Sequence, residues 1–175
     1  MKDQRFAWGI TGAGHTLTAC ADRLLSYKNI DVFFSLAAKE VIRMYALQDR
    51  FEDPELRIVY ETRASSPIVA RLYSGIYRVL VVAPATSNSV AKFACGISDS
   101  LISNLFAQAG KSRVPIMVFP TDLAPDMNTT GPHGEPIKVY PRPVDLENTN
   151  KLRSFPGVTV VESVEELAQC LATYL

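Results

Sequence analysis

The sequence offers few of the side chains from which catalytic or metal sites are usually built. Its 175 residues include two histidines and three cysteines, and no CxxC pair occurs. The missing pair argues against zinc-ribbon and iron–sulfur sites, because these need clustered thiolates. The 18 basic and 18 acidic residues give a formal net charge of zero. This balance argues against a nucleic-acid surface or a basic membrane patch, and it weakly favours self-association.

Several sequence signatures are also missing. The chain has no GxGxxG dinucleotide fingerprint, no P-loop and no GxSxG nucleophile elbow. The two histidines, His15 and His133, have no evident nucleophile or metal-ligand partner nearby in the sequence. We therefore predict no catalytic side chain and no metal site, and we expect a bound cofactor to carry any reaction.

No signal peptide and no apolar run near 18 residues is visible. The cysteines, Cys20, Cys95 and Cys170, are odd in number and widely spaced. Such a set is expected for buried thiols in a reducing compartment. We therefore expect a cytoplasmic protein that does not span a membrane.

Apolar strands alternate with helical segments along the whole chain, and 47% of the residues are hydrophobic. The expected strands are Arg5–Thr11, Ile30–Ser35, Arg57–Tyr60, Arg78–Ala83, Pro115–Phe119 and Val158–Val161. The expected helices are His15–Tyr27, Ala37–Leu47, Ile68–Tyr77, Ser87–Cys95, Ser100–Ala109, Val144–Phe155 and Val164–Tyr174. Because the strands are apolar throughout, the pattern predicts an α/β fold: a three-layer, doubly wound parallel sheet of the Rossmann or flavodoxin type, forming one domain over 1–175.

Polar or glycine-rich residues follow three of these strands. The turn Thr11-Gly12-Ala13-Gly14-His15 could bring the backbone to a phosphate, or it could be only a tight turn before a helix. Ser35 precedes a helix and fits an N-cap. In the stretch from Ala83 to Ser89, Pro84 is expected to end the strand and one hydroxyl must cap the next helix. The others would suit the edge of a flat polar heterocycle, against the small residues Ala83 and Ala85.

The segment Pro120–Pro143 interrupts the alternation. It contains six prolines and two glycines, and it follows a strand, so it emerges at the carboxyl edge of the sheet. Open α/β sheets bind ligands at that edge, and long connections in compact domains are usually functional or mobile. We predict that this segment is an active-site loop that gates a second planar ligand, with trimer packing as the alternative.

Four motifs in order, GITGAG, PATSNS, GISDSLISN and PDMN, resemble those of the homo-oligomeric FMN flavoproteins that include phosphopantothenoylcysteine decarboxylase. The stretch SPIVARLYSGIYRVLVVAPATSNSVAK is most similar to the archaeoflavoprotein and dihydromethanopterin reductase branch. The resemblance implies FMN bound between the subunits of a homotrimer or a multiple of trimers. It implies cofactor contacts from Thr11, Gly12, Ala13, Gly14, His15, Ser35, Ala83, Ala85, Thr86, Ser87 and Ser103. Contacts to a second ligand, a pterin or a second flavin, would come from Asn88, Asp122, Met127 and Asn128.

The sequence departs from the decarboxylases of this family in one important position. Their histidine falls at or near Ala70, and no histidine lies between His15 and His133. The resemblance therefore implies an FMN oxidoreductase that passes electrons from a soluble donor, such as a reduced flavin, to a pterin. A cysteine-decarboxylase-like lyase, a flavin prenyltransferase and a flavin electron carrier remain alternatives. Leu101, Ile102, Leu105 and Phe106 are expected to form the trimer interface.

Overall fold

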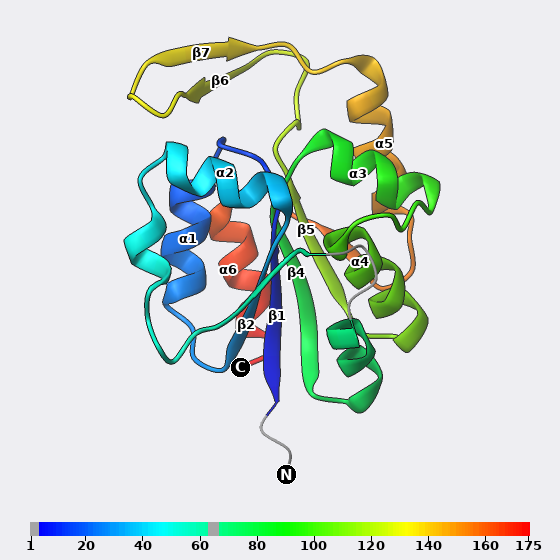
Figure 1. The fold of residues 1–175 in the computed structure, drawn as a ribbon. Helices are drawn as coiled ribbons and strands as arrows, with labels where there is room; N and C mark the ends of the chain where they lie inside the picture. Colours follow the sequence, from blue (N-terminus) through cyan, green and yellow to red (C-terminus); the bar gives the residue numbers. More distant parts are fainter. Residues whose placement is uncertain (1–3, 63–66) are drawn as a thin grey trace.

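The fold is a six-stranded parallel sheet with helices on both faces (Figure 1). This computed structural model describes residues 4–62 and 67–175. The strands of the sheet are β3 (Arg57–Tyr60), β2 (Ile30–Phe34), β1 (Arg5–Ile10), β4 (Tyr77–Ala85), β5 (Ile116–Pro120) and β8 (Val158–Val160), in that spatial order. All five neighbouring pairs are parallel. The predicted three-layer, doubly wound architecture is confirmed.

Helices cover the two faces in separate groups (Figure 1). One face carries α1 (Leu17–Leu25), α2 (Leu36–Met44) and α6 (Val164–Ala172). The other face carries the 3-10 helix η2 (Pro67–Ser74), α3 (Ser87–Cys95), α4 (Leu101–Ser112) and α5 (Pro143–Arg153). A short 3-10 helix, η1 (Gln48–Phe51), follows α2. Each face of the sheet therefore buries its own apolar cluster against these helices.

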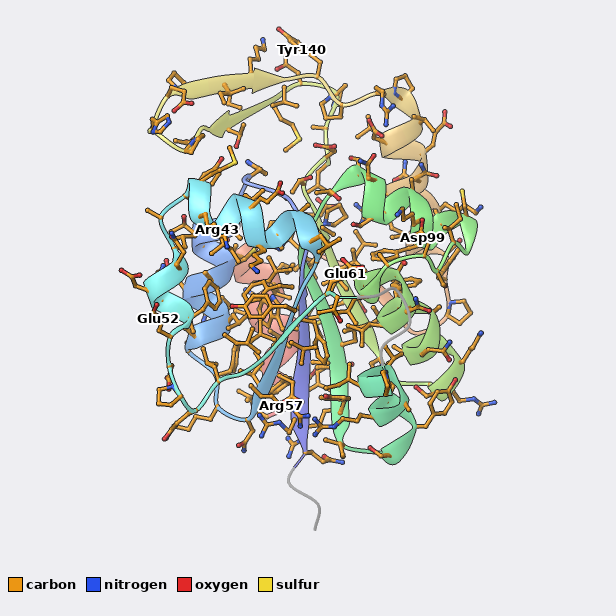
Figure 2. All side chains as sticks on the ribbon, viewed as in Figure 1. Arg43, Glu52, Arg57, Glu61, Asp99 and Tyr140 are labelled. Carbon is orange, nitrogen blue, oxygen red and sulfur yellow. The ribbon has the colours of Figure 1, made fainter. Side chains whose placement is uncertain are left out.

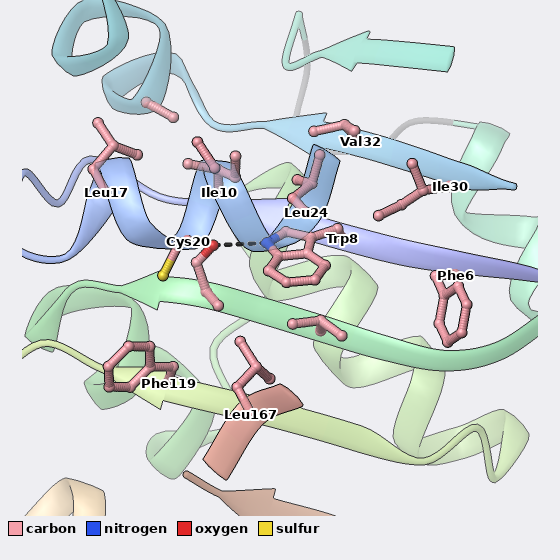
Figure 3. Close-up of a cluster of buried hydrophobic side chains, with 14 of the residues drawn as sticks. Phe6, Trp8, Ile10, Leu17, Cys20, Leu24, Ile30, Val32, Phe119 and Leu167 are labelled. Atoms are coloured by element: carbon pink, nitrogen blue, oxygen red, sulfur yellow. Dashed lines mark hydrogen bonds between the residues drawn. The ribbon is translucent and has the colours of Figure 1, made fainter. Parts of the chain in front are cut away.

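The buried side chains hold β1 against β4, the two central strands. Trp8 is fully buried, and its indole N–H donates a 2.7 Å hydrogen bond to the Ala83 carbonyl oxygen (Figure 3). Cys20 and Leu24 of α1 and Leu167 of α6 pack in the same cluster. A buried donor without a partner is costly, so this bond also fixes the register of the two strands near their carboxyl ends.

Two element predictions differ from the structure in extent. The helix expected over Ile68–Tyr77 is a 3-10 helix that ends at Ser74, and Tyr77 already belongs to β4. The strand expected over Arg78–Ala83 runs from Tyr77 to Ala85, so Pro84 does not end it. There the pairing of β4 with β5 shifts register between Val82 and Ala85.

The segment Pro120–Pro143 contains strands that the sequence analysis did not anticipate. Residues Met127–Thr130 (β6) and Pro136–Val139 (β7) form an antiparallel hairpin, the β6–β7 hairpin. It lies beyond the carboxyl edge of the main sheet, over the ends of α1 and α2, and leads into α5 (Figure 1). Each strand has only four residues and pairs only with the other, so neither shows the long apolar run of a core strand.

The thiols only partly follow the prediction. Cys20 is buried, and burial raises the pKa of its thiol to about 12. Cys170 is half-buried, but Cys95 is exposed at the end of α3, so the expectation of three buried thiols is wrong for Cys95. Within residues 4–62 and 67–175, no helix is long and apolar enough to cross a bilayer.

Candidate functional site

The two central strands, β1 and β4, end side by side. From this pair the strand order runs to one edge of the sheet through β2 and β3 and to the other edge through β5 and β8. The Thr11 hydroxyl, which follows β1, donates a 2.8 Å hydrogen bond to the Pro84 carbonyl and accepts one of 2.9 Å from the Thr86 backbone N–H. Thr11 is buried, so it ties the first glycine turn to the start of α3. This is the topological switch point of the sheet, the place where open α/β sheets bind ligands.

Two cavities meet at this switch point. The first, which we call the helix-end cavity, has a volume of about 310 Å³ and lies where α2, α3 and α4 begin. The second, the hairpin cavity, has a volume of about 290 Å³ and lies between the glycine turn, the start of α3 and the β6–β7 hairpin. Thr86 and Asn88 line both cavities. A ligand with a charged end and a flat end could therefore span the two.

The helix-end cavity is formed largely by helix N-termini. Ser35 caps α2, because its side chain accepts the Ala38 N–H at 3.0 Å, and this confirms the predicted N-cap. Ser100 caps α4 in the same way, accepting the Ser103 N–H at 3.2 Å. Thr86 caps α3, so one hydroxyl of the PATSNS stretch does cap the helix. Helix N-termini carry partial positive charge and N–H groups that have no acceptor within the helix, which together favour an anion.

Glycine is required where the first turn approaches α2. A methyl group on Gly12 would lie 2.5 Å from the Ala37 side chain, and one on Gly14 would lie 2.2 Å from the Tyr45 hydroxyl. Real Cβ atoms do not come so close, so a larger residue at Gly12 would push the turn away from α2, whereas at Gly14 the end of the Tyr45 side chain would have to move aside. Gly12 therefore allows the turn to lie against the start of α2, beside the helix-end cavity.

The hairpin cavity carries an imidazole and a carboxylate. Among the described residues that line it, the titratable ones are His15 and Asp122. The Ser87 hydroxyl donates a hydrogen bond to the Asp122 carboxylate. Burial lowers the pKa of His15, and the nearby Asp122 carboxylate partly opposes this shift. The cavity thus offers a hydroxyl, a carboxylate and an imidazole to a ligand, beside the apolar side chains of Met127 and Val139.

Two hydrogen bonds hold the hairpin over the site. His15 Nδ1 lies 2.8 Å from the Thr129 hydroxyl oxygen, and the Tyr45 hydroxyl donates a 3.0 Å hydrogen bond to the Thr130 carbonyl. The first connects the glycine turn to β6, and the second connects the end of α2 to β6. We call these two bonds the hairpin latch.

The structure brings most of the predicted site residues to these cavities. The helix-end cavity includes Thr11, Gly12, Ser35, Thr86 and Asn88. The hairpin cavity includes Ala13, Gly14, His15, Thr86, Ser87, Asn88, Asp122 and Met127. Asn128 instead lines a third cavity of about 480 Å³, between the hairpin and the start of α1.

Three predicted residues do not line these cavities. Ala83 and Ala85 are fully buried inside the chain. Ser103 is also buried, and its hydroxyl bonds with Ser100 in a capping box. The side chains of these residues therefore have no open path to a ligand in the chain as it stands.

The predicted interface helix must also be corrected. Leu101, Ile102, Leu105 and Phe106 are buried in the chain's own core. An apolar helix face looks the same in sequence whether it meets its own sheet or another subunit. Here it meets the sheet, so these four side chains are not available to a partner.

Several residues around the cavities were not anticipated. They are Glu61, Lys92 and Ser100 in the helix-end cavity, and Thr121, Thr129 and Val139 in the hairpin cavity. Ser100 and Ser103 both lie in the GISDSLISN motif, and Ser100, the N-cap of α4, is the one that lines the cavity. Glu61 directly follows β3, so the rule that ligands bind at the carboxyl ends of strands could have identified it.

A second polar cluster lies at the opposite edge of the sheet. Asp31 is fully buried and accepts hydrogen bonds from Arg5 Nε at 2.6 Å and from the Tyr77 hydroxyl at 2.6 Å. Arg71 on η2 lies 3.1 Å away. These partners satisfy the buried charge and tie η2 to the sheet, so the cluster is structural. Ala70 is also on η2 and does not line either cavity of its own chain.

Comparison with known proteins gives the same family throughout. The family model described as Flavoprotein matches residues 1–174. A dihydromethanopterin reductase (acceptor) of Methanosarcina mazei is 30% identical, covering 97% of this chain and 99% of that protein. An uncharacterized protein of Methanocaldococcus jannaschii is 35% identical, covering 98% of this chain and 96% of that one.

A solved structure agrees with these sequence relatives. The FMN complex of Burkholderia xenovorans DmrB, described as a cubic protein cage for redox transfer, superposes with a TM-score of 0.88. It is 39% identical, covering 98% of this chain and 94% of that chain. The family predicted from the four motifs is confirmed, and the chain belongs to the Flavoprotein family.

Proposed function

We propose that the protein is an FMN-dependent oxidoreductase that passes electrons from a soluble donor to a planar acceptor, a dihydropterin such as dihydromethanopterin. The observation that carries the proposal is the junction of two cavities at Thr86 and Asn88, one formed by helix N-termini and one by polar and titratable side chains. FMN has a phosphate at one end and a flat ring system at the other, so it matches this division. When bound, it would supply the hydride and electron chemistry that the side chains lack.

The helix-end cavity fits the phosphate. The hydroxyls of Ser35 and Ser100 line it, together with the glycine turn at Gly12 and the side chain of Lys92. Lys92 pairs with Asp99 at 2.7 Å, in an exposed position. The phosphate would accept from hydroxyls and backbone N–H groups, the usual way in which helix N-termini bind phosphates.

The hairpin cavity fits the ring system and the acceptor. Ala13 and Gly14 offer small surfaces for close approach, while Ser87, Asn88 and Asp122 offer polar atoms to ring edges. The β6–β7 hairpin lies over this cavity and would exclude water from the transfer step. This position of the hairpin, with Met127, Thr129 and Val139 lining the cavity, is the support for a gate formed by residues 120–143.

The electron donor is a separate molecule in this proposal. The alignment with the Methanosarcina mazei reductase extends over 237 positions, more than the 175 residues of this chain, so that relative carries segments that this chain lacks. Among the described residues, no group of three or more histidine, cysteine or acidic side chains could hold a metal. A soluble donor such as a reduced flavin is therefore the simplest source of electrons.

We further propose that the protein assembles as a homotrimer or a multiple of trimers. Three large apolar side chains are exposed at or near residues that line the helix-end cavity. Leu36 lines the cavity and is 65% exposed, Tyr60 precedes Glu61 and is 47% exposed, and Ile97 lies three residues before Ser100 and is 47% exposed. A cubic cage, the assembly described for DmrB, contains three-fold axes. A subunit boundary beside the cavity would cover these side chains.

A pre-steady-state experiment tests the function. The reconstituted protein is reduced anaerobically and mixed with a dihydropterin in a stopped-flow instrument. We expect rapid, pterin-dependent reoxidation of the flavin. Reoxidation at the buffer-only rate would favour a flavin electron carrier. Carbon dioxide release from phosphopantothenoylcysteine above the no-enzyme control would favour the lyase alternative, which the alanine at position 70 argues against.

A further inference from the structure

Glu61 is the acidic side chain among the described residues that line the helix-end cavity. It directly follows β3, and Figure 2 shows it in the middle of the molecule, with α2 on one side and α3 and α4 on the other. Its backbone N–H donates to the Phe34 carbonyl at 2.9 Å, so its main chain continues the pairing of β3 with β2. The backbone of Glu61 is therefore held in place by the sheet, which positions its side chain.

The Glu61 carboxylate binds the first N–H group of two different helices. One oxygen accepts from the Leu101 N–H at 2.7 Å, at the start of α4, and the other accepts from the Leu36 N–H at 3.0 Å, at the start of α2. The Ser35 and Ser100 hydroxyls already satisfy the third N–H of each helix. Backbone N–H groups at two helix starts thus converge on one anionic group, and that group belongs to the chain itself.

The same N–H groups are suited to a phosphate. The caps beside them, Ser35 and Ser100, line the cavity in which the proposed function places the FMN phosphate. A phosphate bound there would either take the N–H groups from Glu61 or lie next to its carboxylate. In both cases the Glu61 carboxylate lowers the affinity for the phosphate, either by competing for the N–H donors or by charge repulsion.

From this arrangement we propose that Glu61 is a built-in competitor of the cofactor phosphate. In the flavin-free chain its carboxylate satisfies the starts of α2 and α4 and keeps the cavity ordered. When the cofactor binds, the carboxylate weakens the hold on the phosphate, which makes the cofactor exchangeable. This inference rests on the proposed function, because it requires a flavin phosphate in the helix-end cavity.

The test compares FMN with riboflavin, which has the same ring system and no phosphate. Dissociation constants of both flavins are measured by fluorescence quenching for the wild type, for Glu61→Gln and for Glu147→Gln. The last variant makes the same change at an exposed position of α5 and is the matched control. We expect Glu61→Gln to bind FMN at least tenfold more tightly, about 1.4 kcal/mol, with riboflavin affinity unchanged within about twofold. Glu147→Gln should behave as the wild type does.

A second readout follows folding without the cofactor. The glutamine side chain is neutral and its amide nitrogen cannot accept an N–H, so one helix start loses its partner. The flavin-free variant should therefore melt at a lower temperature than the wild type, while the FMN-loaded variant should not.

The outcomes separate the two proposals. An FMN affinity that is unchanged or weaker in Glu61→Gln overturns the inference, as does an equal change for both flavins, which would indicate a purely structural role. A wild-type protein that binds neither flavin would instead count against the proposed function.

Discussion

The two ends of the site are constructed differently. The helix-end cavity is made from the beginnings of three helices that are fixed to the central sheet, and its donors are backbone N–H groups and capping hydroxyls. The hairpin cavity is made in part from a separate two-stranded hairpin, held to the rest by the His15–Thr129 and Tyr45–Thr130 bonds. In the proposed function, the first end fixes the cofactor and the second opens for an acceptor. Changes at the first end should alter affinity, and changes at the second should alter turnover.

The largest effect is expected at Gly12. In Gly12→Ala the new methyl group would lie 2.5 Å from Ala37, so the turn or α2 must move. Such shifts cost about 1–3 kcal/mol, so FMN affinity should fall by about 5- to 150-fold. Gly110→Ala is the control, because a methyl group there meets nothing within 4 Å. Equal FMN affinity in the two variants, measured by fluorescence titration, would show that the turn does not touch the cofactor.

Asn88→Ala should separate binding from turnover. Asn88 lines both cavities and is exposed, so its amide can reach a second ligand. We expect pterin-dependent flavin reoxidation to slow about tenfold, the value of one lost hydrogen bond, with a smaller change in FMN retention. A variant that loses its flavin yet turns over normally when FMN is supplied would contradict this role.

The hairpin latch is the next test of the comparison. The double variant Thr129→Val, Tyr45→Phe removes the two hydrogen bonds but keeps side-chain volumes nearly constant. Acceptor-dependent reoxidation should change by about 3- to 10-fold, because each of these two bonds, one part-buried and one exposed, is worth about 0.5 kcal/mol, while FMN affinity stays near the wild-type value. The control, Tyr140→Phe with Thr159→Val, changes the same residue types at exposed positions. If FMN affinity falls as far as in Gly12→Ala, the two ends do not act separately.

The smallest effect is a pH dependence at the latch. Burial lowers the folded-state pKa of His15 below 6.5, with Asp122 partly opposing it. The unfolded chain therefore binds a proton more readily, so the flavin-free protein should lose stability as pH falls below about 6.5. His15→Gln should lack this contribution, whereas His133→Gln, at an exposed position, should keep it. Urea unfolding at pH 7.5 and 5.5 measures the difference, and equal losses in the wild type and His15→Gln would refute it.

The same division explains what could be predicted from the sequence. The Thr11–His15 turn, Ser35 and Thr86–Asn88 follow long apolar strands, so their positions at the sheet edge could be predicted from the strand pattern alone. The β6–β7 hairpin could not, because its four-residue strands pair only with each other. Glu61 was missed because it is a single acid after a weak strand. The burial of Leu101 and Ile102 depends on which surface meets the helix, and hydrophobic periodicity does not specify that surface.

The most direct measurement is a crystal structure of the protein with FMN. We expect the phosphate within hydrogen-bond distance of the Ser35 or Ser100 hydroxyl and of N–H groups at the starts of α2 and α4. We expect the ring system beside Ala13, Thr86 and Ser87, under the β6–β7 hairpin. FMN bound with its phosphate in the hairpin cavity, or bound away from both cavities, would contradict this expectation.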